Sequence, residues 1–145
     1  MNEKNFNFFQ DHSRHYLEMA LRTDRLEIMK TPDGYGKKIG ECGDTVVIFM
    51  RVVRDVIQAI SFLVDGCINT TACCNTVAHL VEGKRVEDAW EIIPEAVVDY
   101  LETLPPGHAH CAELSVGALY LALSNFQERN RASWKKIYSG ASNDT

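Results

Sequence analysis

The alternation of apolar and polar residues along the first half of the chain predicts one helix followed by a pair of strands. Residues 9–29 place apolar side chains at helical spacing, which predicts an N-terminal helix. Thr45–Val53 and residues 57–64 are apolar runs rich in β-branched side chains, as is typical of buried strands. Only a short polar interval around Arg54 and Asp55 separates them, so we expect an antiparallel hairpin.

The second half of the chain is predicted to be helical. Apolar side chains at helical spacing indicate helices over residues 70–81, 86–92, 94–104 and 111–126. Asn69 or Thr70 can cap the first of these helices, and Gly83 can end it. Residues 31–44, before the strands, are dense in glycine and are predicted to form a loop, with an edge strand before Cys42 as an option.

The order of these elements indicates a single α+β domain, in which a small antiparallel sheet of two to three strands packs against several helices. At 145 residues the chain is long enough for one hydrophobic core and short for two. We expect residues 1–30 to form an N-terminal helical extension, residues 31–138 the core of the domain and residues 139–145 a flexible tail.

Composition narrows the class of protein. A formal charge of −5 argues against nucleic acid as a partner, because proteins that bind it need a basic surface. The chain lacks a stretch of about 18 apolar residues, so neither a membrane-spanning helix nor a membrane partner is expected. The N-terminus lacks the basic and apolar segments of a secretory signal, which favours a cytoplasmic location.

The residues most able to carry chemistry are the five cysteines, Cys42, Cys67, Cys73, Cys74 and Cys111. An odd number of cysteines in a cytoplasmic chain is poor evidence for disulfides and better evidence for metal or thiol chemistry. The alternative is that each thiol is a small buried hydrophobic side chain, and composition alone leaves the two interpretations equally open.

Three of these cysteines lie in loops or at the ends of predicted elements: Cys42, Cys67 and Cys111. Cys67 precedes a predicted helix and Cys111 opens one, and there the helix dipole and unpaired N–H groups favour the thiolate. Asp44, His108 and His110 are near them in sequence and can add an oxygen or nitrogen ligand. Three thiolates with one such ligand suit zinc or an iron–sulfur centre, although the spacing is not that of a zinc finger.

Three segments together resemble the IscU/NifU N-terminal-domain family, the iron–sulfur cluster assembly scaffolds. They are GECGDTV, DGCINTTACCNTVAHLVEGKRVEDA and LETLPPGHAHCAELSVGALYLAL, which lie in the family's order within residues 40–126. The resemblance implies a SufE/NifU-like fold. It also implies that the cluster is held by three cysteines, helped by an aspartate that tunes its lability and a histidine: Cys42, Cys67, Cys111, Asp44 and His110.

The resemblance further implies what the chain does. Members of the family build a [2Fe–2S] cluster from ferrous iron and from sulfur that a cysteine desulfurase delivers as persulfide, and they pass it to recipient iron–sulfur proteins. They also bind zinc in the same pocket. On this basis we expect a scaffold rather than an enzyme, with formation of a homodimer left open. We choose Cys111 as the first persulfide acceptor, because its helix position and two nearby imidazoles favour the thiolate, and a comparable case exists for Cys67.

The chain departs from the better-known scaffolds at three places. Those proteins carry Leu-Pro-Pro-Val-Lys, a segment read by a dedicated chaperone, whereas this chain has LPPGH, so that His108 replaces the lysine and can add an imidazole ligand. Cys73 and Cys74 replace small serines, and we expect Cys73 in the core and Cys74 partly exposed. The N-terminal segment does not match the usual opening. The other histidines are expected to be solvated or on a helix face: His12, His15 and His79.

Two alternatives to the scaffold remain open at this point. In the first, the same residues hold zinc, and the chain carries sulfur as persulfide and stimulates a cysteine desulfurase without building a cluster. In the second, the chain is an interaction or regulatory module whose metal pocket only stabilises the fold. A direct enzyme is the weaker interpretation, because the catalytic motifs that we considered are absent from the sequence.

Overall fold

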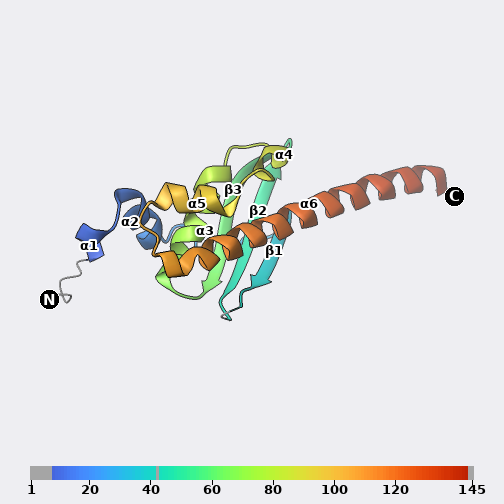
Figure 1. Cartoon of the computed structure of the whole chain (residues 1–145). Coiled ribbons are helices and arrows are strands. Elements are labelled where there is room, and N and C mark those ends of the chain that lie inside the picture. Colours follow the sequence, from blue (N-terminus) through green and yellow to red (C-terminus); the bar gives the residue numbers. More distant parts are fainter. Residues whose placement is uncertain (1–7, 42, 144–145) are drawn as a thin grey trace.

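The computed structural model describes residues 8–41 and 43–143. Its elements follow in this order: α1 (Phe8–Asp11), α2 (Arg14–Leu21), β1 (Gly34–Ile39), β2 (Thr45–Val53), β3 (Val56–Asp65), α3 (Ile68–Val81), α4 (Val86–Ala89), α5 (Pro94–Leu101), the 3₁₀-helix η1 (Pro106–His108) and α6 (Ala109–Asn143). A three-stranded sheet packs against these helices, which confirms the predicted α+β class (Figure 1).

The sheet is an antiparallel meander in the order β1-β2-β3. Arg54 and Asp55 both have positive φ, 53° and 66°, as a tight two-residue turn requires, and this confirms the predicted hairpin. β1 confirms the optional edge strand before Cys42 and corrects the prediction of a loop there. Its glycines allow close packing of α6, since a Cβ atom on Gly36 would lie 2.5 Å from the backbone nitrogen of Ala122.

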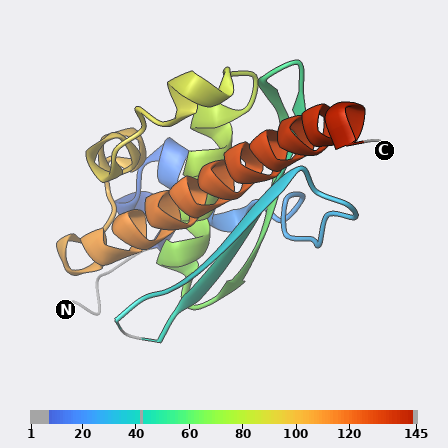
Figure 2. The same cartoon turned by 90° about the vertical axis from the view of Figure 1, so that its right-hand side faces the viewer.

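The core lies between one face of the sheet and the helices. In β2, buried Val46, Ile48 and Met50 alternate with half-buried residues, as expected for a strand with one face against the core. α6 runs diagonally across β1 and β2, while α3 lies behind it and contacts β3, α2, α5 and α6 (Figure 2). α3 is therefore surrounded by other elements, and most of its residues are buried.

The N-terminal segment differs from the single helix predicted over residues 9–29. Ser13 starts a separate helix, α2, because its hydroxyl accepts a hydrogen bond of 3.0 Å from the backbone N–H of Tyr16. Beyond α2 the chain turns at Asp24 and Arg25, and Leu26 forms an isolated parallel bridge with Phe62 of β3. The backbone N–H of Phe62 donates to the carbonyl of Arg25 at 2.9 Å. This segment thus covers the β3 edge of the sheet, which would otherwise expose unpaired backbone groups.

The central helix, α3, begins earlier than predicted. Cys67 is its N-cap and Ile68 its first residue, so Asn69 and Thr70 lie inside the first turn and do not cap the helix. Gly83, with φ 88°, follows the last turn and fits the predicted end. The shift places the sulfur of Cys67 directly at the N-terminal end of α3.

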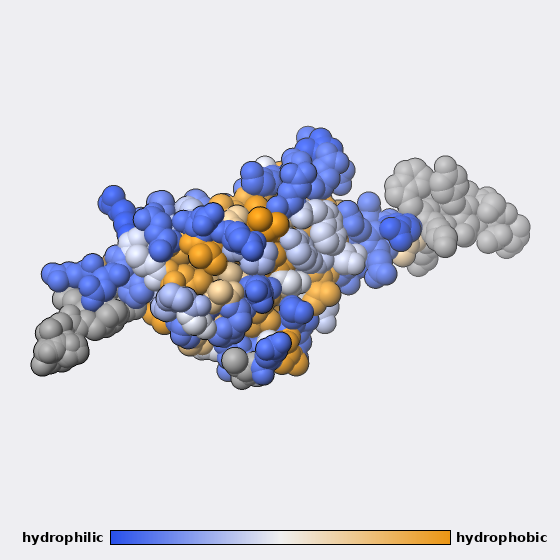
Figure 3. All heavy atoms as spheres, viewed as in Figure 1, coloured by the Kyte–Doolittle hydropathy of each residue, from blue (hydrophilic) through white to orange (hydrophobic). Residues whose placement is uncertain are grey.

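The last helix is longer than predicted. α6 starts at Ala109 and continues to Asn143, past the predicted end at residue 126 and through most of the predicted tail. Figures 1 and 3 show that it extends beyond the sheet, where the described side chains at residues 127–131 are polar. α4 and α5 each end three residues earlier than predicted, at Ala89 and Leu101. In the described part of the chain, no helix has both the length and the apolar character needed to span a bilayer.

Candidate metal centre

Cys67 lies where β3 passes into α3, and its side chain is exposed. Partial burial raises the pKa of its thiol, but hydrogen bonds from the backbone and side chains of Thr70 and Asn69 outweigh that effect and lower the pKa below the usual value. The prediction that the helix terminus favours the thiolate of Cys67 is therefore confirmed. An accessible thiol of lowered pKa is suited to react with sulfur and to bind metal.

Cys111 lies in the first turn of α6 and is fully buried. Burial raises the pKa of its thiol; the hydroxyl of Thr70 lowers it, and the negative charges of Cys67 and Asp44 raise it further. The net pKa is above the usual value, so the premise that Cys111 favours the thiolate is wrong for the metal-free chain. The residues that oppose ionisation are the other predicted ligands, and a cation among them would remove that opposition.

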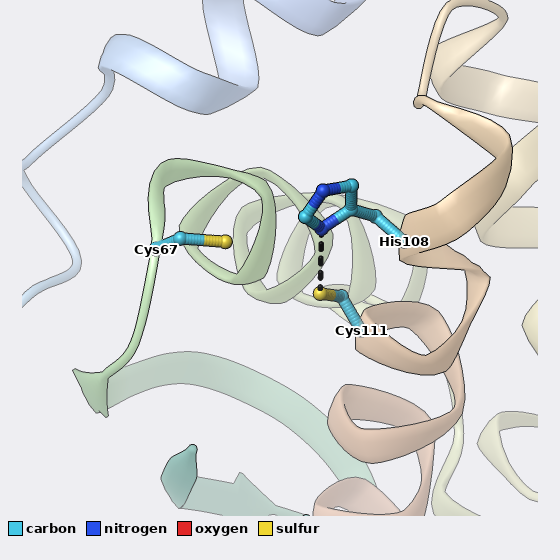
Figure 4. Close-up of side chains that lie close together, drawn as sticks. All are labelled: Cys67, His108 and Cys111. Atoms are coloured by element: carbon cyan, nitrogen blue, oxygen red, sulfur yellow. Dashed lines mark hydrogen bonds between the residues drawn. The ribbon is translucent and has the colours of Figure 1, made fainter. Parts of the chain in front are cut away.

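Two imidazoles flank the sulfur of Cys111. Nδ1 of His108, from η1, lies 3.9 Å from Sγ of Cys111 (Figure 4), and Nε2 of His110 lies 3.7 Å from the same sulfur. The two rings stack with their centroids 5.7 Å apart. His108 is half-buried and His110 is exposed, so the two histidines face different surroundings.

Thr70 connects the remaining site residues, and sequence reasoning missed it. Its hydroxyl lies 3.1 Å from Oδ2 of Asp44, 3.4 Å from Sγ of Cys111 and 3.8 Å from Sγ of Cys67. A Cβ atom on Gly66 would lie only 2.9 Å from Oδ2 of Asp44, so the glycine lets that carboxylate approach the thiols. Thr70 follows Cys67 by one helical turn, and that spacing is the signal that could have identified it.

The ligand atoms of Cys67, His108 and Cys111 all lie within 4.8 Å of one another. Figure 4 shows the three side chains pointing toward a common space. Two ligands of one tetrahedral metal ion are separated by about 3.6–3.8 Å, given metal–sulfur bonds near 2.3 Å and metal–nitrogen bonds near 2.1 Å. The three side chains thus fit one ion after small movements. Among the described residues, this is the one group of three or more such ligands that lies so close together. Cys42, the third predicted thiol, lies outside the described residues.

The two remaining thiols belong to the core. Cys73 is buried as predicted, but Cys74 is also buried, so the prediction of a partly exposed thiol is wrong. Burial raises the pKa of both thiols well above the usual value. The reason is that α3 is enclosed on nearly all sides and has no exposed face at this level. A role as metal ligands in the closed core has no support from this geometry.

The N-terminal segment contacts the centre through Tyr16 of α2. The buried phenol of Tyr16 donates a 2.6 Å hydrogen bond to Oδ1 of Asn69, in the first turn of α3. Burial raises the pKa of that phenol, and the nearby sulfurs of Cys67, Cys73 and Cys111 raise it further. The predicted N-terminal extension therefore packs against the first turn of α3, next to the thiols of the centre.

Two of the other histidines are less solvated than predicted. The ring of His12 stacks on Tyr16, and its Nδ1 lies 2.9 Å from the hydroxyl of Thr103. The ring of His15 stacks on Tyr100 and hydrogen-bonds the backbone carbonyl of that residue at 3.2 Å. Both side chains join the N-terminal segment to α5 and the residues after it. His79 is exposed on α3, as predicted.

The fold and this centre define a class of protein, an α+β domain that presents thiol and imidazole ligands at the N-terminal ends of two helices. The chain belongs to the family of the NifU-like N terminal domain, whose model matches residues 27–133. This confirms the family predicted from the three sequence segments.

The chain is similar in sequence to individual proteins that are named for iron–sulfur cluster assembly. The iron–sulfur cluster assembly scaffold protein IscU 1 of Archaeoglobus fulgidus is 32% identical over 89 residues, which cover 61% of this chain and 58% of that protein. The chain thus matches little more than half the length of this relative. The iron sulfur cluster assembly protein 1 of Trachipleistophora hominis is 25% identical over 134 residues, which cover 86% of this chain and 94% of that protein.

Solved structures show the same fold. FiSufU of Fervidobacterium islandicum superposes with a TM-score of 0.64 at 16% identity, over 81% of this chain and 99% of that one. A NifU-like N-terminal protein of Brucella abortus superposes with a TM-score of 0.63 at 20% identity, over 80% of this chain and 94% of that one. At these identities the likeness concerns the fold alone.

Proposed function

We propose that this chain is a scaffold on which a [2Fe–2S] cluster is assembled from ferrous iron and sulfur and from which it is passed to other proteins. The observation that carries the proposal is the convergence of Cys67 and Cys111 from two separate helices, with an imidazole beside them, in a member of this family. Relatives of the chain bear the name of iron–sulfur cluster assembly scaffolds, which supports the same role. A scaffold holds its cargo and performs no turnover of its own, so we propose no enzymatic activity.

The ligand set that we propose combines strong and exchangeable ligands. Cys67 and Cys111, with Cys42 as the third thiolate, bind iron through strong bonds. Asp44, which the hydroxyl of Thr70 holds beside the thiols at 3.1 Å, provides a weaker oxygen ligand, and His110 provides an alternative nitrogen. Ligands of unequal strength allow the site to retain a cluster during assembly and to release it afterwards. The same ligands suit zinc, which the chain can hold in place of iron.

Sulfur enters the site as persulfide from a cysteine desulfurase, with Cys111 as the proposed first acceptor. Two imidazole nitrogens lie within 3.9 Å of its sulfur and can accept the thiol proton as the sulfur attacks. Attack on the terminal sulfur of the donor's persulfide forms a new S–S bond on Cys111 and releases the donor's thiolate, so the transfer itself changes no net oxidation state. Cys67 is the competing acceptor, because its side chain is exposed and its pKa is lowered. Peptide mass mapping of the persulfide, in C67S and C111S variants, separates the two.

The direct test is anaerobic assembly. The metal-free chain is incubated with a cysteine desulfurase, cysteine, ferrous iron and dithiothreitol. Iron supplies part of the electrons that reduce the sulfur to sulfide, and dithiothreitol supplies the rest. We expect the visible spectrum of a [2Fe–2S] cluster, equal amounts of iron and sulfide, and transfer of the cluster to an apo-ferredoxin. Omission of the desulfurase is the control.

The zinc-bound sulfur carrier gives a different result in the same experiment. It would show stoichiometric zinc and a persulfide on one thiol, faster turnover of the desulfurase, and no visible absorption after reconstitution. That result would overturn the scaffold proposal. The regulatory module makes a third prediction, since its function would survive Cys42→Ser. The partners that we propose are accordingly a cysteine desulfurase and recipient apoproteins, and a homodimer and a cytoplasmic location stay predictions.

Release of the cargo has its own test at Asp44. We expect Asp44→Ala to lengthen the lifetime of the loaded cluster, because it removes the weakest and most exchangeable ligand. The decay of visible absorption in the presence of a chelator measures that lifetime. A lifetime equal to or shorter than that of the wild type would contradict this role for Asp44.

A further inference from the structure

We propose that His108 is the imidazole ligand of a mononuclear metal site, formed with Cys67 and Cys111, that a ferrous ion occupies before sulfur arrives. The proposal rests on the proposed function for the nature of its cargo. The proposed property is the binding of a single metal ion, which can be measured without sulfur and therefore independently of cluster assembly.

The distances to the two sulfurs distinguish His108 from His110. A ring nitrogen of His108 and the sulfurs of Cys67 and Cys111 all lie within 4.8 Å of one another. Nε2 of His110 is close to Cys111, at 3.7 Å, but in the described part of the chain no comparably close group of three includes His110. Figure 4 shows the ring of His108 beside the sulfur of Cys111, with the side chain of Cys67 pointing toward both. His108 is thus the imidazole that can bind the same ion as both thiolates.

The backbone holds His108 in place without a metal ion. Its N–H donates a 2.9 Å hydrogen bond to the carbonyl of Pro105, which closes the single turn of η1. Pro105 and Pro106 restrict the backbone of this turn, since each proline fixes its own φ angle. A ligand on a preformed turn loses little conformational entropy when it binds. The ring of His108 is half-buried, which limits its motion further.

Charge also favours an imidazole at this position. Two thiolates balance the charge of one divalent ion, and a neutral imidazole adds a third bond without adding net charge to a site that is partly removed from water. A carboxylate or a further thiolate in place of His108 would add a negative charge beside that of Asp44, whose Oδ2 lies 3.1 Å from the hydroxyl of Thr70. Binding of the ion displaces the protons of the two thiols, and those protons pass to solvent.

The test is anaerobic titration of the metal-free chain with Co²⁺, which reports its ligands through thiolate charge-transfer bands and tetrahedral d–d bands. We expect His108→Ala to weaken Co²⁺ binding by at least about tenfold and to change the d–d bands, since loss of even an outer partner costs about 10–100-fold in metal affinity. His79→Ala, which removes an exposed imidazole on α3 outside the centre, is the control and should leave Co²⁺ affinity and spectra unchanged. His110→Ala tests the competing imidazole beside Cys111, and its effect should be smaller than that of His108→Ala. X-ray absorption of the Fe²⁺-loaded chain should lose its imidazole scattering in His108→Ala alone.

His108→Gln accompanies these variants, because glutamine keeps a side chain of similar reach and protects the turn of η1. Circular dichroism of each variant verifies the fold. Unchanged Co²⁺ affinity and spectra in His108→Ala and His108→Gln, or an effect confined to His110→Ala, would overturn the proposal. If the wild type still assembled a cluster, the scaffold function would stand without this site. If instead His108 proved to be a ligand but no cluster formed with the desulfurase, the site would stand and the scaffold function would fail.

Discussion

Two parts of one helix, the N-terminal end of α3 and its middle, place the same functional group in opposite conditions. Cys67 caps the helix, is exposed, and has a thiol pKa that hydrogen bonds from the first turn lower despite partial burial. Cys73 and Cys74 lie about two turns further on, are buried on all sides, and have pKa values that burial raises well above the usual one. The chemistry of a thiol in this fold therefore depends on its position in the element, not on the residue type.

The comparison also explains how a small domain can hold a reactive centre beside its core. The helix ends supply polarised N–H groups and access to solvent, while the middle of α3 supplies packing against α2, α5, α6 and β3. Residues between the two parts, such as Thr70, are buried yet still reach the sulfurs with a polar atom. The boundary between core and centre is thus a single helical turn.

The largest difference between the two parts should appear in cluster assembly. We expect Cys67→Ser to abolish the visible spectrum after reconstitution, because a hydroxyl is a far weaker ligand for iron than a thiolate. Cys74→Ala, in the middle of the same helix, should retain the spectrum and lose about 1–2 kcal/mol of unfolding free energy from the small cavity. Retention of the cluster in Cys67→Ser, or its loss in a folded Cys74→Ala, would contradict the assignment of metal binding to the N-terminal end of α3 and of packing to its middle.

Reactivity toward a small electrophile should separate the same thiols without any metal. At neutral pH we expect iodoacetamide to alkylate Cys67 at least about 100-fold faster than Cys73 or Cys74, since only the thiolate reacts and only Cys67 is accessible. The rate for Cys67 should reach half its maximum below the ordinary thiol pKa of about 8.5. Peptide mass spectrometry of the metal-free chain measures each site. Equal rates at the three thiols would show that the core opens as readily as the centre.

The two parts of α3 also show which features of the fold can be predicted from the sequence. The strands, the hairpin at Arg54 and Asp55 and the order of the helices were predictable, because period and turn chemistry are local properties. The burial of Cys74 was not, since α3 is enclosed on nearly all sides and helical periodicity assumes one exposed face. The residues of β1 were predicted mainly as loop for a related reason. Glycine is typical of turns, but Gly36 is present because α6 packs too close to the strand to leave room for a side chain.

The centre was predictable in its ligands and not in its details. The convergence of Cys67 and Cys111 was expected from the resemblance to a family, and the structure brings the two thiols together. Their relative pKa values were not predictable, because burial of Cys111 and its negative neighbours follow from packing. Thr70 was missed because a lone threonine in a helix carries no motif, and only the folded chain shows that its hydroxyl lies between Asp44 and the two sulfurs.

Alkaline pH should weaken the folded state through the middle of α3. In the unfolded chain Cys73 and Cys74 ionise near pH 8.5, whereas burial keeps them protonated in the folded chain. The unfolded state then binds fewer protons, so unfolding free energy falls as pH rises above about 8.5, by up to about 1.4 kcal/mol per pH unit for each thiol. Urea unfolding at pH 8 and pH 10 measures the slope. Cys74→Ala should reduce it by about half of the contribution of the pair, and an unchanged slope would show that Cys74 ionises in the folded state.

The smallest expected effect tests the boundary itself, at Thr70. Thr70→Val keeps the shape of the side chain and removes the hydroxyl that helps to lower the pKa of Cys67. The pH profile of Cys67 alkylation should therefore move to higher pH, and the rate at pH 7 should fall by about three- to tenfold, because less thiolate is present. Thr71→Val is the matched control: its backbone N–H still donates to the carbonyl of Cys67 at 3.3 Å. If Thr70→Val folds and leaves the profile where it is, the hydroxyl of Thr70 does not contribute. The backbone N–H groups of the first turn and the side chain of Asn69 then set the reactivity of Cys67.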